Sequence, residues 1–205
     1  MILKNLLRIT KSYKLSLIAI IFFELIFIIR GYKGNKLNFT GTDKMSDNIP
    51  CPYYFLKKIK KVLKKNEFNR FLDLGCGSGR IIDFFHKNFK NKEFIGIEFF
   101  LDQYNFSKKL FQDINNIKII QTDFTSLEFV KYNPDCLFLN NPFKDEKESI
   151  DFVKKIINSN KLKKNILIIL VNYNKRLIET LNNVNYVDSY YINEIKGYSI
   201  LRLNG

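Results

Sequence analysis

Residues 71–80 read Phe-Leu-Asp-Leu-Gly-Cys-Gly-Ser-Gly-Arg, an apolar strand that runs into three alternating glycines. Glycine adopts left-handed backbone angles without steric cost, so such a loop lets a ligand lie against bare main chain. We expect a helix to follow, and the first N–H groups of a helix favour an anion. A tight strand-to-helix turn without any ligand explains the same ten residues. The residues that follow this stretch at fixed distances must therefore decide whether the loop binds a ligand.

Strands and helices alternate from residue 69 onward, as judged by apolar runs and by apolar positions at helical spacing. Strands are predicted at residues 70–74, 93–98, 117–121, 135–139, 165–172, 185–191 and 197–203. Helices are predicted at residues 53–65 and near residues 79–90, 101–112, 145–158 and 174–182. This alternation favours a mostly parallel sheet covered on both faces. The last two strands, joined by residues 193–197, predict a closing hairpin.

Polar residues stand where the predicted strands end, and ligands of such sheets bind outside the carboxyl ends of the strands. Asp73 closes the first strand. Glu98 closes the second, 19 residues beyond Gly79, where a carboxylate can hold the two hydroxyls of a ribose. The third strand leads into Asp123 and Phe124, an acceptor for an exocyclic amine beside a ring that can stack on a base. These residues together predict a nucleoside-containing ligand.

Taken in order, the segments DLGCGSG, GIE, TDF and NNPF resemble the class I (Rossmann-like) S-adenosylmethionine-dependent methyltransferases over about residues 50 to 205. The dinucleotide fingerprint G-x-G-x-x-G would instead need glycine in place of Arg80. The resemblance implies an α/β fold, a three-layer sandwich whose seven-stranded, mostly parallel sheet has an antiparallel last strand. It also implies S-adenosyl-L-methionine as the cofactor and methyl transfer as the activity.

The resemblance assigns a role to each residue at these strand ends. The methionine end of the cofactor is assigned to Asp73, Gly75, Gly77, Gly79 and the main chain of Cys76, the ribose to Glu98, the adenine amine to Asp123, and the faces of the purine to Phe99 and Phe124. No residues with the spacing of a metal site accompany them, so we expect no metal.

The stretch Asn140, Asn141, Pro142 and Phe143 follows the fourth strand and contains the candidate catalytic residues. Methyl transfer is an in-line displacement, so catalysis consists chiefly in positioning a nucleophile and accepting its protons. The amino-methylating branch of the family has [N/D/S]-P-P-[F/Y] at this place. Asn141 departs from that pattern, which weakens the case for a nucleobase or glutamine amine as acceptor. A capped turn without catalytic role is the alternative for Asn141.

Residues 15–29 form an apolar run with Glu24 in its middle. Basic residues flank it on both sides: Lys4, Arg8, Lys11 and Lys14 before it, and Arg30, Lys33 and Lys36 after it. As a helix it would span about 22 Å, against about 30 Å for the hydrocarbon core of a bilayer. Three interpretations stay open, namely a membrane-associated helix, a helix packed on its own domain or on a partner, and a cleaved signal peptide. The chain thus divides into residues 1–30 (an N-terminal apolar and basic helix), 31–52 (a linker or lid) and 53–205 (the methyltransferase domain).

The formal net charge of +14 is concentrated at the start of the chain. Residues 1–66 hold 14 Lys and Arg against three acidic residues, whereas residues 67–205 hold 20 against 17. This placement suits an anionic membrane surface at least as well as RNA. Because the implied cofactor is made and kept in the cytosol, we expect a cytoplasmic enzyme attached to the cytoplasmic face of a membrane. The fourth strand's ending is also similar to that of a bacterial group with N-P-F at this place, several members of which accompany surface-polysaccharide genes, and this resemblance implies a small or a lipid- or saccharide-linked acceptor. An RNA or protein N-methyltransferase and a non-catalytic, membrane-attached cofactor-binding module are the alternatives.

Overall fold

The computed structural model describes residues 17–32, 50–159 and 162–204. Two predictions concern residues outside these ranges. The basic residues ahead of the N-terminal helix lie outside them, and so does most of the segment 31–52 that was predicted to be a linker or lid.

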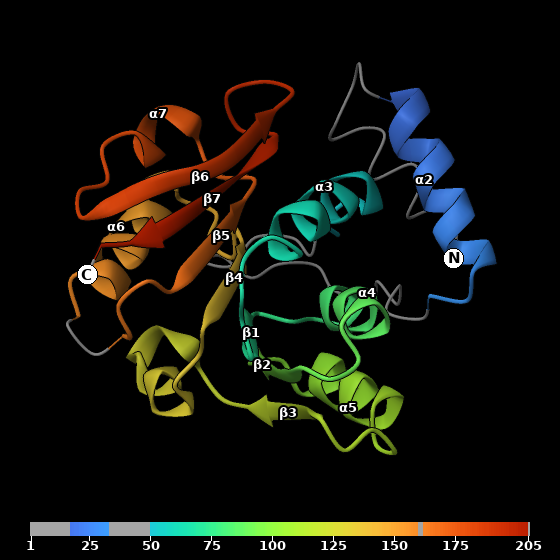
Figure 1. Cartoon of the computed structure of the whole chain (residues 1–205). Coiled ribbons are helices and arrows are strands. Elements are labelled where there is room, and N and C mark those ends of the chain that lie inside the picture. Colours follow the sequence, from blue (N-terminus) through green and yellow to red (C-terminus); the bar gives the residue numbers. More distant parts are fainter. Residues whose placement is uncertain (1–16, 33–49, 160–161, 205) are drawn as a thin grey trace.

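The described residues contain a seven-stranded sheet with the order β3-β2-β1-β4-β5-β7-β6 (Figure 1). Its strands are β1 (Arg70–Leu74), β2 (Glu93–Glu98), β3 (Ile117–Gln121), β4 (Cys136–Asn140), β5 (Leu167–Val171), β6 (Val184–Tyr191) and β7 (Gly197–Leu203). Strands β1 to β5 pair in parallel, whereas β7 runs antiparallel to both β5 and β6. The predicted α/β fold, with its closing hairpin, is confirmed.

Helices cover both faces of this sheet. On one face lie α3 (Tyr53–Leu63), α4 (Arg80–Asn88) and α5 (Leu101–Leu110); on the other lie α6 (Glu146–Ile157), α7 (Lys175–Ile178) and the 3-10 turns η2 (Phe124–Ser126) and η3 (Glu128–Tyr132). Successive strand residues alternate between the two faces, so Phe71 packs in the first core and Leu72 in the second. The result is the predicted three-layer sandwich.

Helix α7 is shorter than the predicted helix at 174–182. Asn174 caps its start, because the Asn174 side chain accepts a hydrogen bond from the Arg176 N–H at 3.0 Å. Beyond Ile178 the chain tightens into turns, and Asn183 takes a left-handed φ of 61°. This left-handed residue ends any helical path and redirects the chain into β6.

Helix α2 (Leu17–Ile29) packs outside α3 and α4 and forms an additional layer on that side of the molecule (Figure 1). The Phe27 ring stacks on Tyr53, with 4.8 Å between the ring centroids, and meets Phe84 edge-on at 5.4 Å. One face of α2 therefore packs against the domain. Among the described residues, no helix combines the length and the apolar character that crossing a bilayer requires.

A buried ion pair joins α2 to the residue that follows the glycine loop. The Arg80 Nη2 atom donates to both carboxylate oxygens of Glu24 at 2.6 Å, and the two residues are 5% and 1% exposed. The Tyr53 N–H also donates to Glu24 at 2.8 Å, while Arg80 Nε donates to the Cys51 carbonyl at 2.9 Å. The guanidinium carbon lies 3.8 Å from the centroid of the Tyr53 ring. Both buried charges are thus paired and hydrogen-bonded, as burial of charge requires.

Substitution of one member of this pair tests its importance. Glu24→Ala leaves a buried guanidinium without its counter-charge, so we expect the free energy of unfolding to fall by about 3–5 kcal/mol in urea denaturation. The double variant Glu24→Leu/Arg80→Met removes both charges and should lose clearly less than the sum of the single variants. Lys154→Ala, which removes an exposed pair with Asp151, is the control and should change little. Additive losses would contradict the coupling.

Candidate functional site

The glycine loop between β1 and α4 is held over the end of β2. The N–H groups of Gly75 and Cys76 both donate to the Ile97 carbonyl at 2.9 Å. Gly79 has a φ of +83°, and a Cβ placed there would lie 2.5 Å from the Phe111 ring, so the fold itself requires glycine at this position. At Gly75, with a φ of +75°, the nearest atom to such a Cβ is 3.7 Å away. That atom belongs to the Phe124 ring and would be in ordinary van der Waals contact, and Gly75 itself is exposed, so its main chain is accessible to a ligand.

Two buried carboxylates, Asp73 and Glu98, stand behind this loop. The two oxygens of Glu98 accept hydrogen bonds from the N–H groups of Gly77 and Phe100, at 2.8 and 2.9 Å. Asp73 is 2% exposed, and its Oδ2 atom has no hydrogen-bond partner among the described residues. Such an acceptor is costly to bury unless a donor or a cation reaches it. The pair therefore suits a ligand that brings positive charge and hydrogen-bond donors.

Burial also changes the proton affinity of these two groups. Burial, and secondarily the charge of Glu98, raises the pKa of Asp73 well above its usual value. Burial raises the pKa of Glu98 as well, and the N–H groups of Phe100 and Gly77 counteract that rise. A cation bound beside Asp73 would favour its ionised form and lower its pKa again. Ligand binding and ionisation of Asp73 are therefore coupled.

The residues predicted to hold a base differ in their exposure. Asp123 is exposed, and one of its oxygens accepts a hydrogen bond from the Thr125 N–H at 2.8 Å, which caps η2. Phe99 is 49% exposed just beyond β2. Phe124 is 2% exposed, and its ring packs 5.5 Å from that of Phe152. Phe99 thus offers an open ring face, whereas Phe124 belongs to the core; that either flanks a purine stays a prediction.

Cys76 lies within the loop and is 5% exposed. Burial raises the pKa of its thiol well above the usual value, so the thiol stays protonated and is a poor nucleophile. The main chain of Cys76 is the part that shapes the loop, through the bond to Ile97. Within the described ranges, no group of three or more His, Cys, Asp or Glu side chains is arranged to hold a metal ion.

Asn140 is the last residue of β4 and pairs with Val171 at the end of β5. The Asn172 side chain, just beyond β5, donates from Nδ2 to Asn140 Oδ1 at 2.8 Å. Because the two strands are parallel neighbours, their carboxyl ends bring these two amides together. Asn140 therefore sits, oriented by a hydrogen bond, on the same edge of the sheet as Asp73 and Glu98.

The remaining residues of the candidate catalytic stretch hold the loop in place. Asn141 takes a φ of 30°, and its side-chain oxygen accepts a hydrogen bond from Ser149 Oγ on α6 at 2.6 Å. Phe143 is 9% exposed and packs 5.5 Å from Phe152, while Pro142 is half-buried. These contacts anchor the loop to α6. Of the four predicted residues, Asn140 has the environment best suited to contact a ligand.

A small cavity beside this loop contains a residue that sequence reasoning missed. The cavity is lined by Asn141, Glu146, Ser149, Ile150, Tyr173, Asn174 and Leu177. Tyr173 is 2% exposed, burial raises the pKa of its hydroxyl, and that hydroxyl has no hydrogen-bond partner among the described residues. The sequence signal for Tyr173 is the polar segment 172–174, which directly follows the apolar fifth strand. The sequence analysis considered the polar residues at the ends of the first four strands but not those after the fifth.

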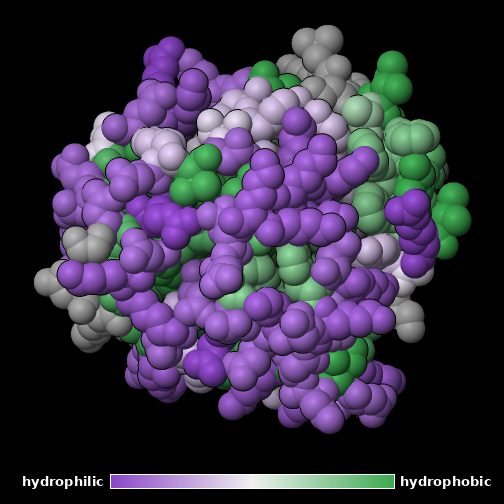
Figure 2. Space-filling model, viewed as in Figure 1, coloured by the Kyte–Doolittle hydropathy of each residue, from purple (hydrophilic) through white to green (hydrophobic). Residues whose placement is uncertain are grey.

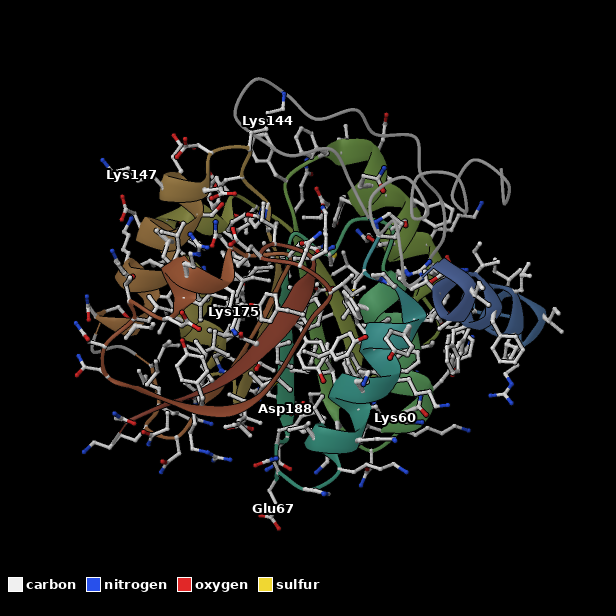
Figure 3. All side chains as sticks on the ribbon, turned by 90° about the horizontal axis from the view of Figure 1, so that it is seen from above. Lys60, Glu67, Lys144, Lys147, Lys175 and Asp188 are labelled. Carbon is white, nitrogen blue, oxygen red and sulfur yellow. The ribbon has the colours of Figure 1, made fainter. Side chains whose placement is uncertain are left out.

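The charge of this cavity is also defined by its lining. Glu146 is its one carboxylate, and it accepts a hydrogen bond from Asn174 at 3.0 Å. No cation belongs to its lining among the described residues. Lys144 and Lys147, near in sequence, lie at the outside of the molecule in Figure 3. The cavity has room for about one water molecule, so it is a small polar gap beside the loop.

Comparison with known families and structures agrees with this geometry. Residues 71–161 match the family described as "Methyltransferase domain". No curated protein matches the chain. The family match includes the glycine loop and the ends of β2, β3 and β4.

Many solved structures share the fold. They include the N-methyltransferase NodS from Bradyrhizobium japonicum WM9, with 11% identity, a TM-score of 0.57, and coverage of 75% of this chain and 96% of that one. An RNA methyltransferase from Salinibacter ruber in complex with S-adenosyl-L-homocysteine has 14% identity, a TM-score of 0.57, and coverage of 76% and 94%. A putative caffeoyl-CoA O-methyltransferase from Staphylococcus aureus has 14% identity, a TM-score of 0.59, and coverage of 98% of both chains. At these identities the likeness establishes the fold.

Proposed function

We propose that the chain is a class I S-adenosylmethionine-dependent methyltransferase that methylates a hydroxyl or amine of a small or a lipid- or saccharide-linked acceptor. The fold and the match of residues 71–161 to a methyltransferase domain support this proposal. One observation carries this proposal. Glu98 and Asn140 end β2 and β4, Asp73 is the penultimate residue of β1, and Asp123 lies two residues beyond β3, so all four lie at the carboxyl ends of four neighbouring parallel strands. Three acids on one side and an oriented amide on the other are suited to a cationic cofactor and a nearby nucleophile.

The described residues fit S-adenosylmethionine at several points. The unpartnered oxygen of Asp73 and the bare main chain at Gly75 suit the charged methionine end, and Glu98 suits the ribose hydroxyls. When bound, this cofactor supplies an activated methyl group on a positively charged sulfur. Asp73 and Glu98 contribute negative charge and hydrogen-bond acceptors at the place where such a ligand needs them.

The acceptor would enter beside Asn140. An amide oxygen stays neutral at all relevant pH values, so Asn140 can orient an O–H or N–H of the acceptor without competing for the methyl group. Asn172 holds that amide in one orientation. The effect expected from such groups is positioning, which accounts for most of the catalysis in a displacement of this kind.

Weaker observations support the two alternatives, an RNA methyltransferase and a non-catalytic cofactor-binding module. The Salinibacter ruber neighbour is an RNA methyltransferase, and the basic N-terminal third of this chain suits a polyanion. Yet the excess of basic residues lies ahead of the glycine loop in the sequence, whereas residues 67–205 hold 20 Lys and Arg against 17 acids, which disfavours RNA as the acceptor at the strand ends. Formation of S-adenosylhomocysteine with any cell-extract fraction would exclude a non-catalytic module.

Cofactor binding is the first test, by calorimetry of the full chain with S-adenosylmethionine. Glu98→Ala removes a charged acceptor, and we expect affinity to fall roughly 10- to 100-fold. Glu93→Ala, an exposed acid on the same strand, is the matched control and should bind as the wild type does. No binding by the wild type, or equal binding by Glu98→Ala, would sink the cofactor assignment.

The pH dependence of this binding tests the role of Asp73. Because burial raises the pKa of Asp73 in the free protein, affinity for the cationic cofactor should increase as the pH rises through that pKa. For the unliganded protein the sign is opposite, since a raised carboxyl pKa contributes stability at low pH that is lost as the pH rises. Asp73→Asn should bind weakly and without this pH dependence. An unchanged profile in Asp73→Asn would assign the titration elsewhere.

Substitution of Asn140 tests the acceptor side. In an extract fraction that supports turnover, Asn140→Ala should lower the rate of S-adenosylhomocysteine formation by about 10- to 100-fold while cofactor affinity stays unchanged. Asn185→Ala, an exposed asparagine on β6, serves as the control. Loss of cofactor affinity instead of rate would place Asn140 in the cofactor site.

A further inference from the structure

Helix α2 presents a row of large apolar side chains to the outside. Ile18, Phe22, Leu25 and Ile29 are 87%, 57%, 42% and 83% exposed. Their spacing of four, three and four residues puts them on one face of a helix. We name this row the outer stripe. Figure 2 shows hydrophobic side chains gathered over α2 at the right edge of the molecule, beside the hydrophilic surface of the front.

The opposite face of the same helix is already occupied. Ile20, Glu24 and Phe27 are 0%, 1% and 6% exposed, because α3 and α4 cover them. A helix that is apolar on all sides is normally buried on all sides. Within residues 17–32, 50–159 and 162–204, the domain covers only the inner face of α2, and the outer stripe calls for a second apolar environment.

The charges around α2 indicate which environment that is. Residues 1–42 contain seven Lys and Arg and one acid, Glu24, which is bound inside the domain by Arg80. Among the described cations, Arg30 directly follows α2 and is exposed, whereas Lys57 of α3 lies 4.3 Å from the centroid of the Phe23 ring, which packs against the core. An exposed apolar row in a segment with such an excess of cations is a pattern that anionic lipid surfaces attract.

We infer that α2 docks the protein on an anionic membrane surface, lying in the plane of the interface with the outer stripe in the acyl region. Its thirteen residues span about 20 Å, too short for the hydrocarbon core of about 30 Å. The pairing of Glu24 with Arg80 also keeps the inner face on the domain. A second copy of the chain is a poorer partner for the stripe, since it would bring the same excess of cations against this one.

Vesicle binding by the full chain tests this inference independently of methyl transfer. The vesicles contain equal parts of phosphatidylcholine and phosphatidylglycerol, with pure phosphatidylcholine as the comparison. We expect co-sedimentation with the anionic vesicles, weaker binding to the neutral ones, and weakening by salt. Ile18→Ser/Ile29→Ser should reduce the partition constant at least about tenfold. Tyr186→Ser removes a side chain that is 50% exposed on β6 and is the matched control.

Each other outcome overturns the inference. Wild-type protein that ignores anionic vesicles contradicts it directly. Equal binding by the double variant and the wild type would assign membrane attraction to lysines elsewhere, such as those of α3. Self-association that the double variant abolishes, without vesicle binding, would make the stripe a protein interface. Salt-sensitive RNA binding without vesicle binding would assign the basic segment to nucleic acid. Because the substituted side chains are exposed, unchanged circular dichroism and thermal melting should accompany the variants.

Discussion

The buried pair of Glu24 and Arg80 is the contact on which the arrangement of the site depends. Arg80 is the first residue of α4 and directly follows the last glycine of the loop, so its position fixes where the loop ends. Glu24 in turn receives the first N–H of α3 and ties α2 to both helices. Charges this deeply buried are tolerated only when every partner is in place. The glycine loop, α2 and α3 thus form one cooperative unit.

This unit has two faces with different tasks. Its inner side borders the loop and the carboxylates of Asp73 and Glu98, where we propose cofactor binding. Its outer side carries the apolar stripe of α2, where we infer lipid contact. The inferred lipid contact and the proposed cofactor site would together suit an acceptor that is linked to a lipid.

Local sequence patterns predicted the strands of the sheet well, because the alternation of apolar runs and polar turns that defines a strand is local in the sequence. The bounds of β1, β2, β3 and β7 agree with the predicted strands, since buried strands read as apolar runs between polar turns. Contacts distant in sequence were not predictable in this way. Glu24 and Arg80 are 56 residues apart, and the sequence does not indicate that they pair. Taken alone, Glu24 is a charge within an apolar helix, and Arg80 stands where a dinucleotide fingerprint would have glycine.

Some features of the candidate site follow from local sequence patterns, and others depend on contacts that are distant in the sequence. The positions of Asp73, Glu98 and Asn140 follow from the rule that strand ends meet at one edge. The burial of Phe124 and the cavity at Tyr173 depend on side-chain packing across α6, which no spacing rule contains. A crystal structure of the full chain with S-adenosylhomocysteine tests the central claim most directly. We expect the ribose within hydrogen-bond distance of Glu98 and the amino acid end of the ligand beside Asp73 and Gly75. A ligand bound elsewhere, or in the reverse orientation, would contradict the proposed cofactor site.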